Sequence, residues 1–193
     1  MVREEAAWKQ GYQMIAGLDE AGRGPLAGPV VAAAFVIKPD FKYVGLNDSK
    51  QMTELQRKKC FEFLKSGAWE YGVGIVEPIE IDEINIYQAS RQAMRKALLA
   101  LPKAPDCLLV DALIVPETEI YQESIIHGDA LSIAIAAASV VAKCVRDRLM
   151  EEYEITYPGY GFAKHKGYGT VAHYQALAEL GPSPIHRRSF RLE

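Results

Sequence analysis

The sequence has few cysteines and no long apolar run, and both absences narrow the class of protein. Only three of the 193 residues are cysteines, Cys60, Cys107 and Cys144. Because they are odd in number and scattered through apolar or helical stretches, we expect reduced thiols and neither a disulfide framework nor a zinc site. No apolar stretch approaches the ~20 residues of a membrane span, and residues 1–10 hold no apolar signal core. We therefore expect a cytoplasmic protein without a membrane partner.

Two common nucleotide-binding patterns are also missing. No Gly-Lys-Ser/Thr sequence is present for a P-loop. The glycines of residues 22–28 superficially resemble a dinucleotide fingerprint, but that fingerprint opens a helix. The sequence PVVAAAFVI at residues 29–37 is instead typical of a strand. A Rossmann cofactor site is therefore not expected.

Positive charge is scarce overall and unevenly placed. The net charge is −3, yet residues 164–193 carry five basic and two acidic side chains, so the rest of the chain totals −6. A small basic surface next to an acidic one would suit a nucleic-acid partner. Lys166, Arg187 and Arg188 are candidate contacts to a phosphate backbone. A charged, solvated C-terminus is the alternative interpretation.

The hydrophobic content of 49% is typical of a globular chain, and no repeat, low-complexity segment or linker divides it. Periodicity predicts strands and helices in alternation. The predicted strands are residues 13–19, 29–37, 69–76, 106–111 and 119–126, and the predicted helices are residues 53–66, 86–101, 130–154 and 170–180. We expect a single α/β domain over residues 1–193, with a mixed central sheet flanked by helices and a helical part from about 155 to 193.

Four acidic residues stand at the ends of the predicted elements. Asp19 and Glu20 close the first strand, Asp111 closes the strand-like run at 107–110, and Asp129 follows His127 and Gly128 at the start of a helix, where an acid also suits an N-cap. Several carboxylates gathered together would repel one another unless a cation binds. Hard oxygen ligands of this kind favour Mg²⁺ or Mn²⁺. The sequence therefore predicts a divalent-metal enzyme.

The four histidines are kept out of this predicted metal site, because the spacing of His127, His165, His173 and His186 fits no common zinc motif. The small residues at 134–138 are better explained by close packing of a helix against the sheet than by binding.

An ordered set of motifs resembles the type 2 ribonucleases H, in their bacterial form ribonuclease HII. The motifs are DEAGRGPLAGP at 19–29, NDSK at 47–50, LVD at 109–111, GD at 128–129, ASVVAK at 138–143, RD at 146–147, HKGYGT at 165–170 and SPIHRRSF at 183–190. Together with the strand that leads into the first motif, they cover the chain from about residue 14 to 190 in the family's order. The resemblance implies an RNase H-like fold and a monomeric endonuclease.

The resemblance also implies a reaction and a substrate. Such an enzyme hydrolyses the phosphodiester on the 5′ side of a ribonucleotide, in an RNA/DNA hybrid or embedded singly in duplex DNA. It leaves a 3′-hydroxyl and a 5′-phosphate, and it starts the removal of misincorporated ribonucleotides. Two Mg²⁺ or Mn²⁺ ions held by Asp19, Glu20, Asp111 and Asp129 would activate a water and stabilise the leaving oxygen.

Further residues are assigned to substrate binding by the same resemblance. The turn Gly22, Arg23 and Gly24 would offer main-chain groups to the 2′-hydroxyl, since glycine lets the backbone approach a sugar. Tyr168 would pack on the sugar of the 3′-side nucleotide. Contacts to phosphates would come from Lys50, Ser139 and Lys143, the last two one helical turn apart.

Three other interpretations remain open from the sequence. Ribonuclease HIII shares this architecture and prefers longer hybrids, but such relatives usually carry an extra N-terminal domain. A non-catalytic hybrid-binding protein would not need all four acids. A metal-dependent phosphatase for small molecules would not need the turn at 22–24 together with Tyr168.

Overall fold

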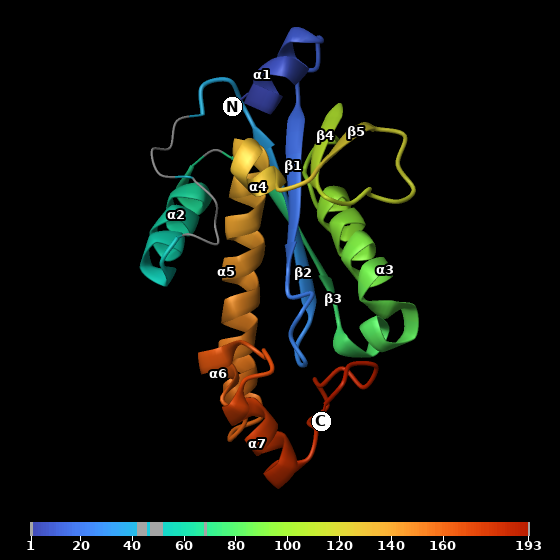
Figure 1. The fold of residues 1–193 in the computed structure, drawn as a ribbon. Helices are drawn as coiled ribbons and strands as arrows, with labels where there is room; N and C mark the ends of the chain where they lie inside the picture. The colour runs from blue at the N-terminus through green and yellow to red at the C-terminus, as the bar shows by residue number, and fades with distance from the viewer. Residues whose placement is uncertain (1, 42–45, 47–51, 68, 193) are drawn as a thin grey trace.

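The computed structural model describes residues 2–41, 46, 52–67 and 69–192. At its centre lies a five-stranded mixed sheet with the order β3-β2-β1-β4-β5 (Figure 1). β2 pairs antiparallel with β1 and β3, whereas β4 pairs parallel with β1 and β5. The strands are β1 (Ile15–Ala21), β2 (Val30–Ile37), β3 (Tyr71–Val76), β4 (Cys107–Asp111) and β5 (Tyr121–Ile125). The α/β class and the five predicted strands are confirmed.

Helices cover both faces of the sheet. They are α1 (Val2–Lys9), α2 (Glu54–Ser66), α3 (Pro78–Leu99), α4 (Gly128–Leu131), α5 (Ile133–Thr156), α6 (Phe162–His165) and α7 (Val171–Leu180). Figure 1 shows α5 and α3 on opposite sides of β1 and β2, with α6 and α7 at the far end of α5. Alternate residues of β4 follow this division, since Leu109 packs in the core beneath α5 and Leu108 in the core beneath α3.

The long helix α5 lies directly on β1. A Cβ added to Gly17 would stand 2.1 Å from the backbone carbonyl carbon of Ala134, so no side chain fits between the two elements. This confirms that the small residues at 134–138 serve packing. Side chains two apart in a strand share a face, so Asp19 points toward α5 as Gly17 does. The close approach therefore brings a charged residue of the strand against the helix.

Two local predictions need correction. α3 begins at Pro78, not at 86, but Asn85 interrupts it with a φ of 67° and its side chain accepts the N–H groups of Tyr87 and Gln88. The predicted start therefore marks the second of two joined segments. Asp129 is not the N-cap of the long helix: it lies inside the single turn α4, and Ser132 caps α5 by accepting the N–H of Ile135.

The N-terminal helix α1 was not predicted, because its sequence has little amphipathic pattern. Its position depends on a tertiary contact. The buried Glu4 carboxylate accepts hydrogen bonds from the Ser132 hydroxyl at 2.6 Å and the Ala134 N–H at 3.0 Å. The charge of Glu4 thus faces the N-terminus of α5, where it interacts favourably with the helix dipole.

The three cysteines are free thiols, as the sequence predicted. Cys60 and Cys107 are buried, and Cys144 is half-buried. Burial raises the pKa of Cys107 and of Cys144 to about 11, so both stay protonated near neutral pH. Within the described ranges, no helix combines the length and the apolar character needed to cross a membrane.

Candidate active site

The acidic residues meet because two parallel strands end side by side. Asp19 and Glu20 lie at the end of β1, and Asp111 is the last residue of β4. The parallel register pairs Leu18 with Val110, which places Asp19 and Asp111 at the same level of the sheet. Carboxyl ends of adjacent parallel strands are a usual place for a functional site.

A cavity of about 510 Å³ opens at this edge of the sheet. Three acids line it together with most of the residues assigned to substrate binding. The lining residues are Asp19, Glu20, Ala21, Gly22, Arg23, Gly24, Arg57, Asp111, Ser139, Lys143 and Tyr168. The structure thus brings into one cavity groups that the sequence separates by up to 149 positions, from Asp19 to Tyr168.

Asp19 is the most enclosed of the three cavity acids. Its pKa is raised well above the ordinary value, first by burial and then by the charges of Glu20 and Asp111. A hydrogen bond from the Ser139 side chain on α5 and one from the Glu20 N–H at 2.7 Å act in the opposite direction. The carboxylate is therefore unfavourably placed as an anion without a nearby cation.

Glu20 experiences a similar conflict of charges. Burial raises its pKa to about 7, Arg23 lowers it and Asp111 raises it. The Arg23 guanidinium lies 3.3 Å from the Glu20 carboxylate and is half exposed. Among the described residues, this half-exposed arginine is the only cationic side chain that pairs with Glu20. The acids of this wall are therefore poorly neutralised.

Asp129 lies beside this group and not on the lining described for the cavity. It is buried in α4. The preceding residue, Gly128, donates its N–H to the Asp111 carboxylate at 2.7 Å, which ties α4 to the end of β4. Among the described residues, no three acidic, histidine or cysteine side chains are yet gathered closely enough to hold a metal ion. The four acids would therefore need to draw together around an ion.

The turn after β1 and Tyr168 form the other wall of the cavity. Gly22 has a φ of +98°, which favours glycine, and a Cβ there would lie 2.1 Å from Nε of Arg146. A Cβ on Gly24 would be 3.6 Å from the Tyr168 ring, so the ring rests against the turn. Tyr168 is nevertheless half exposed. The turn and the ring together present backbone and an aromatic face to the cavity.

Two buried arginines hold this wall in place, and the sequence did not reveal their role. Arg187 donates to the carbonyl oxygens of Gly22 at 2.6 Å, Arg23 at 3.0 Å and Gly28 at 2.9 Å. The guanidinium groups of Arg187 and of the second arginine, Arg146, are almost fully buried. Burial lowers the pKa of Arg187 to about 9. Hydrogen bonds to carbonyls satisfy a buried guanidinium without an acid. The expected phosphate contact of Arg187 is therefore wrong.

The second arginine joins the segment that follows the turn to the segment that precedes Tyr168. Arg146 on α5 donates to the carbonyl oxygens of Pro29 at 3.0 Å, Ala27 at 3.1 Å and Lys166 at 3.0 Å. Its position three residues after Lys143 puts it on the same side of α5. Beside its place in the motif at 146–147, that spacing is the signal by which the sequence could have pointed to it.

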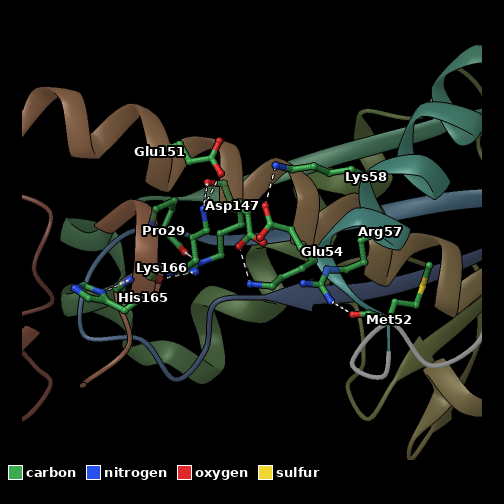
Figure 2. A network of polar contacts seen from close by, with 12 residues as sticks. Pro29, Met52, Glu54, Arg57, Lys58, Asp147, Glu151, His165 and Lys166 are labelled. Atoms are coloured by element: carbon green, nitrogen blue, oxygen red, sulfur yellow. Dashed lines mark hydrogen bonds and ion pairs between the residues drawn. The ribbon is translucent and has the colours of Figure 1, made fainter. Parts of the chain in front are cut away.

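Ion pairs change the expected roles of the lysines near the cavity. Lys166 lies 2.7 Å from Glu151 and is mostly buried, so it is not the exposed phosphate contact expected from the charge of the C-terminal region (Figure 2). Lys143 does line the cavity, and its ammonium lies 2.6 Å from Asp147 one turn along α5. Arg188 remains exposed. Lys50 lies outside the described residues.

Arg57 is a further cavity residue that sequence reasoning missed. It belongs to α2, lines the cavity and donates to the carbonyl of Met52 (Figure 2). Nothing in the local sequence distinguishes it from the neighbouring Lys58, which instead pairs with Glu54 at 2.8 Å. Only the packing of α2 against α5 selects Arg57.

The comparison with known families agrees with this geometry. A family model described as Ribonuclease HII matches residues 16–193. The chain belongs to the ribonuclease HII family. Ribonuclease HII of Clostridioides difficile strain 630 is 54% identical over 187 residues, which cover 97% of this chain and 73% of that protein. The ribonuclease HII chain is therefore an endonuclease of the ribonuclease H type.

Solved structures support the RNase H-like fold. The ribonuclease H2 of Pyrococcus horikoshii OT3 has a TM-score of 0.78 and 30% identity, covering 93% of this chain and 95% of that one. Bst-RNase HIII, solved in complex with Mn²⁺, has a TM-score of 0.72 and 19% identity, covering 97% of this chain and 70% of that one. At that identity the second likeness concerns the fold alone. The family match favours type HII over the HIII alternative.

Proposed function

We propose that this ribonuclease HII chain hydrolyses the phosphodiester on the 5′ side of a ribonucleotide, in RNA/DNA hybrids and at a single ribonucleotide embedded in duplex DNA. The products are a 3′-hydroxyl and a 5′-phosphate, and the reaction starts the removal of ribonucleotides from DNA. The chain acts as a monomer in one catalytic domain, residues 1–193, whose helical part from about 155 contributes to substrate binding.

One observation carries this proposal: the acidic wall and the turn with Tyr168 line the same cavity. A hydrolytic site for any phosphodiester would need only the acids. The turn at 22–24 adds backbone groups that can approach a 2′-hydroxyl, which is the chemical difference between RNA and DNA. The ring of Tyr168 beside Gly24 adds a surface for the neighbouring sugar. Together they support a site that reads a ribose and cuts next to it.

The residues of the acidic wall fit a divalent cation. Asp19 and Glu20 are buried acids whose pKa values are raised by burial and by neighbouring acids, so a cation would relieve an existing conflict. We assign Asp19, Glu20, Asp111 and Asp129 as ligands of Mg²⁺ or Mn²⁺. Two bound ions would supply an activated water and neutralise charge on the leaving 3′ oxygen. Bst-RNase HIII, whose structure contains Mn²⁺, has the same fold.

The remaining cavity residues would orient the substrate. Gly22, Arg23 and Gly24 present main-chain groups to the ribose, and Tyr168 packs on the 3′-side sugar. Ser139 and Lys143 lie on the same face of α5 and on the cavity lining, where they can meet a phosphate. Lys50 is proposed as a further phosphate contact. Such contacts position the strand but do not read its sequence.

The decisive experiment compares two substrates under one condition. Cleavage of a DNA duplex containing one ribonucleotide is measured beside cleavage of a continuous RNA/DNA hybrid, in Mg²⁺, in Mn²⁺ and in EDTA. We expect a cut on the 5′ side of the single ribonucleotide, a 3′-hydroxyl product and no cleavage in EDTA. Cleavage of the hybrid alone would contradict the proposal and restore the HIII alternative.

A further inference from the structure

Behind Tyr168 lies a cluster of three histidines, two of them buried, that the proposed chemistry does not use. The rings of His165 and His173 stack with their centroids 4.4 Å apart, and Nε2 of His173 lies 3.0 Å from Nε2 of His186. His173 and His186 are buried. The cluster therefore sits inside the protein, between α6, α7 and the C-terminal segment.

The hydrogen bonds of this cluster allow one arrangement of its protons. The N–H of Ser183 points at Nδ1 of His186 at 2.9 Å, so Nδ1 is an acceptor and the proton of this neutral ring is on Nε2. Nε2–H of His186 then donates to Nε2 of His173. His173 in turn must carry its proton on Nδ1, which donates to the carbonyl oxygen of Tyr168 at 2.9 Å.

This order makes a directed chain of hydrogen bonds. It runs from the Ser183 backbone through His186 and His173 to the backbone of Tyr168. Only neutral rings can complete it, since a second proton on either ring would set two N–H groups against each other. Burial lowers the pKa of both His186 and His173, which keeps the rings neutral near neutral pH.

The residue after His186 holds the opposite side of the same wall. Arg187 donates to the carbonyl oxygens of Gly22 and Arg23, and its own N–H donates to Leu26 at 2.9 Å. The dipeptide at 186–187 therefore connects, through two independent routes, to the turn and to Tyr168. One segment thus contacts both recognition elements, in addition to the link that Arg146 makes between Ala27, Pro29 and Lys166.

We propose that His186 and His173 are positioning residues, which fix the backbone of Tyr168 relative to the turn that Arg187 holds. The inference rests on the proposed function of Tyr168 as the reader of the 3′-side sugar. Neither histidine touches the substrate. They act on selectivity by setting where the Tyr168 ring stands, and the metal ligands are left unchanged.

The competing explanation is that the histidines only fill the core beside Phe162, whose ring centroid is 5.6 Å from that of His173. Two substitutions at one position separate the explanations. His173→Phe keeps an aromatic ring and loses the hydrogen bond to Tyr168. His173→Asn loses the ring, but its amide nitrogen occupies nearly the place of Nδ1 and can still donate to the same carbonyl.

The measurement is kcat/KM on a duplex with one embedded ribonucleotide divided by kcat/KM on a continuous hybrid, at saturating Mg²⁺. We expect His173→Phe to lower this ratio about three- to tenfold, the effect of one lost hydrogen bond on a rate. We expect His173→Asn to keep the ratio within about twofold of the wild type, even though lost packing lowers its thermal midpoint. The opposite pattern, with Phe normal and Asn impaired, would overturn the proposal in favour of packing.

Tyr168→Ala provides the background that separates this inference from the proposed function. If Tyr168→Ala lowers the ratio, adding His173→Phe should lower it no further, because both changes act through the same ring. If Tyr168→Ala leaves the ratio unchanged, the proposed role of Tyr168 fails. If Tyr168→Ala lowers the ratio but His173→Phe alone does not, only the positioning role is overturned.

A second pair of substitutions, at His186, tests the proposal even if the His173→Phe protein does not fold. His186→Gln keeps an amide N–H that can reach Nε2 of His173, whereas His186→Leu removes the donor. We expect the ratio to fall for Leu and to stay near the wild type for Gln. Equal ratios for the two variants would overturn the proposal.

Discussion

The two walls of the cavity are stabilised in opposite ways. The acidic wall consists of Asp19, Glu20 and Asp111. Burial raises the pKa of Asp19 and of Glu20, and the charge of the nearby Asp111 raises both further. The recognition wall, the turn at 22–24 with Tyr168, has its carbonyl groups held by buried side chains at 2.6–3.0 Å. The acidic wall is electrostatically unfavourable until a cation binds. The recognition wall is held in place by hydrogen bonds without any ligand.

The proposed function accounts for this difference. Carboxylates that repel one another favour the binding of a cation, because the bound cation relieves their repulsion. The free energy released in this way adds to the affinity for the cation. A recognition surface gains from rigidity instead, because a rigid site loses less entropy when it binds. Changes in the acidic wall should therefore cost activity and spare stability, whereas changes in the recognition wall should alter selectivity.

Asp19→Asn in the acidic wall should lower the cleavage activity more than any other substitution proposed here. It removes a charged ligand while keeping the shape, and we expect at least a ~10²-fold loss of cleavage, comparable to removing other electrostatic groups from active sites. Without metal, the thermal midpoint should rise, because burial of the charge and repulsion from Glu20 are relieved. Duplex binding should persist, since phosphate contacts supply much of the affinity. Near-normal turnover in Mg²⁺ would contradict the role of Asp19.

Tyr168→Ala should remove the aromatic surface of the recognition wall and leave the acidic residues unchanged. Stacking contacts are worth ~1–3 kcal/mol, so we expect cleavage at a single embedded ribonucleotide to fall by about one to two decades. Activity on a continuous hybrid should fall less. Tyr168→Phe, which keeps the ring, should lie between the wild type and Ala. Equal losses on both substrates would show that the ring has no specific role at the junction.

Lys143→Ala should remove one contact between the cavity and a substrate phosphate. If Lys143 meets one phosphate, the slope of log K against log salt should flatten by roughly one unit, with similar weakening for all duplex sequences. The loss should be moderate, because Lys143 already pairs with Asp147. Arg148→Ala, which removes a charge paired with Glu152 on an exposed part of α5, is the matched control. An unchanged slope for Lys143→Ala would assign this lysine to the ion pair alone.

The dependence of stability on pH should differ in sign between the two regions. In the metal-free protein the folded pKa of Glu20 is about 7, above the ordinary 4.5, so the folded state binds more protons and stability falls as pH rises from 4.5 to 7. His186 has a folded pKa of about 4, below the ordinary 6.5, owing to burial and then to His173. Its unfolded state binds more protons, so stability rises with pH from 4 to 6.5.

Urea unfolding in EDTA between pH 4 and 7 separates these contributions. Glu20→Gln should make stability rise more steeply with pH, because the opposing acid is gone. His186→Gln should make it rise less steeply. These are the smallest effects expected, since each involves about one proton. If neither substitution changes the slope, the proposed charge states of the two regions are wrong.

The sheet and the acidic wall could be foreseen because their signals are local. The apolar run before Asp19 and the run before Asp111 each predict a buried strand ending in an acid. In parallel strands such ends meet at one edge, so the acids come together without any detailed knowledge of packing. The helix at 130–154 was predicted for the same reason, but Ser132 as its cap was not, because Asp129 is an equally good capping residue by type.

The sequence by itself determined the family, the sheet and the acids of the cavity, since motif order and periodicity are properties of the chain. Only the tertiary structure decided which basic side chains face the solvent or the cavity and which are buried and support the cavity wall. Arg187 and Arg188 are adjacent and chemically identical, yet Arg187 is buried against three carbonyl groups and Arg188 is exposed. The partners of Arg187 lie more than 150 residues away, and contacts at that separation leave no pattern in the local sequence.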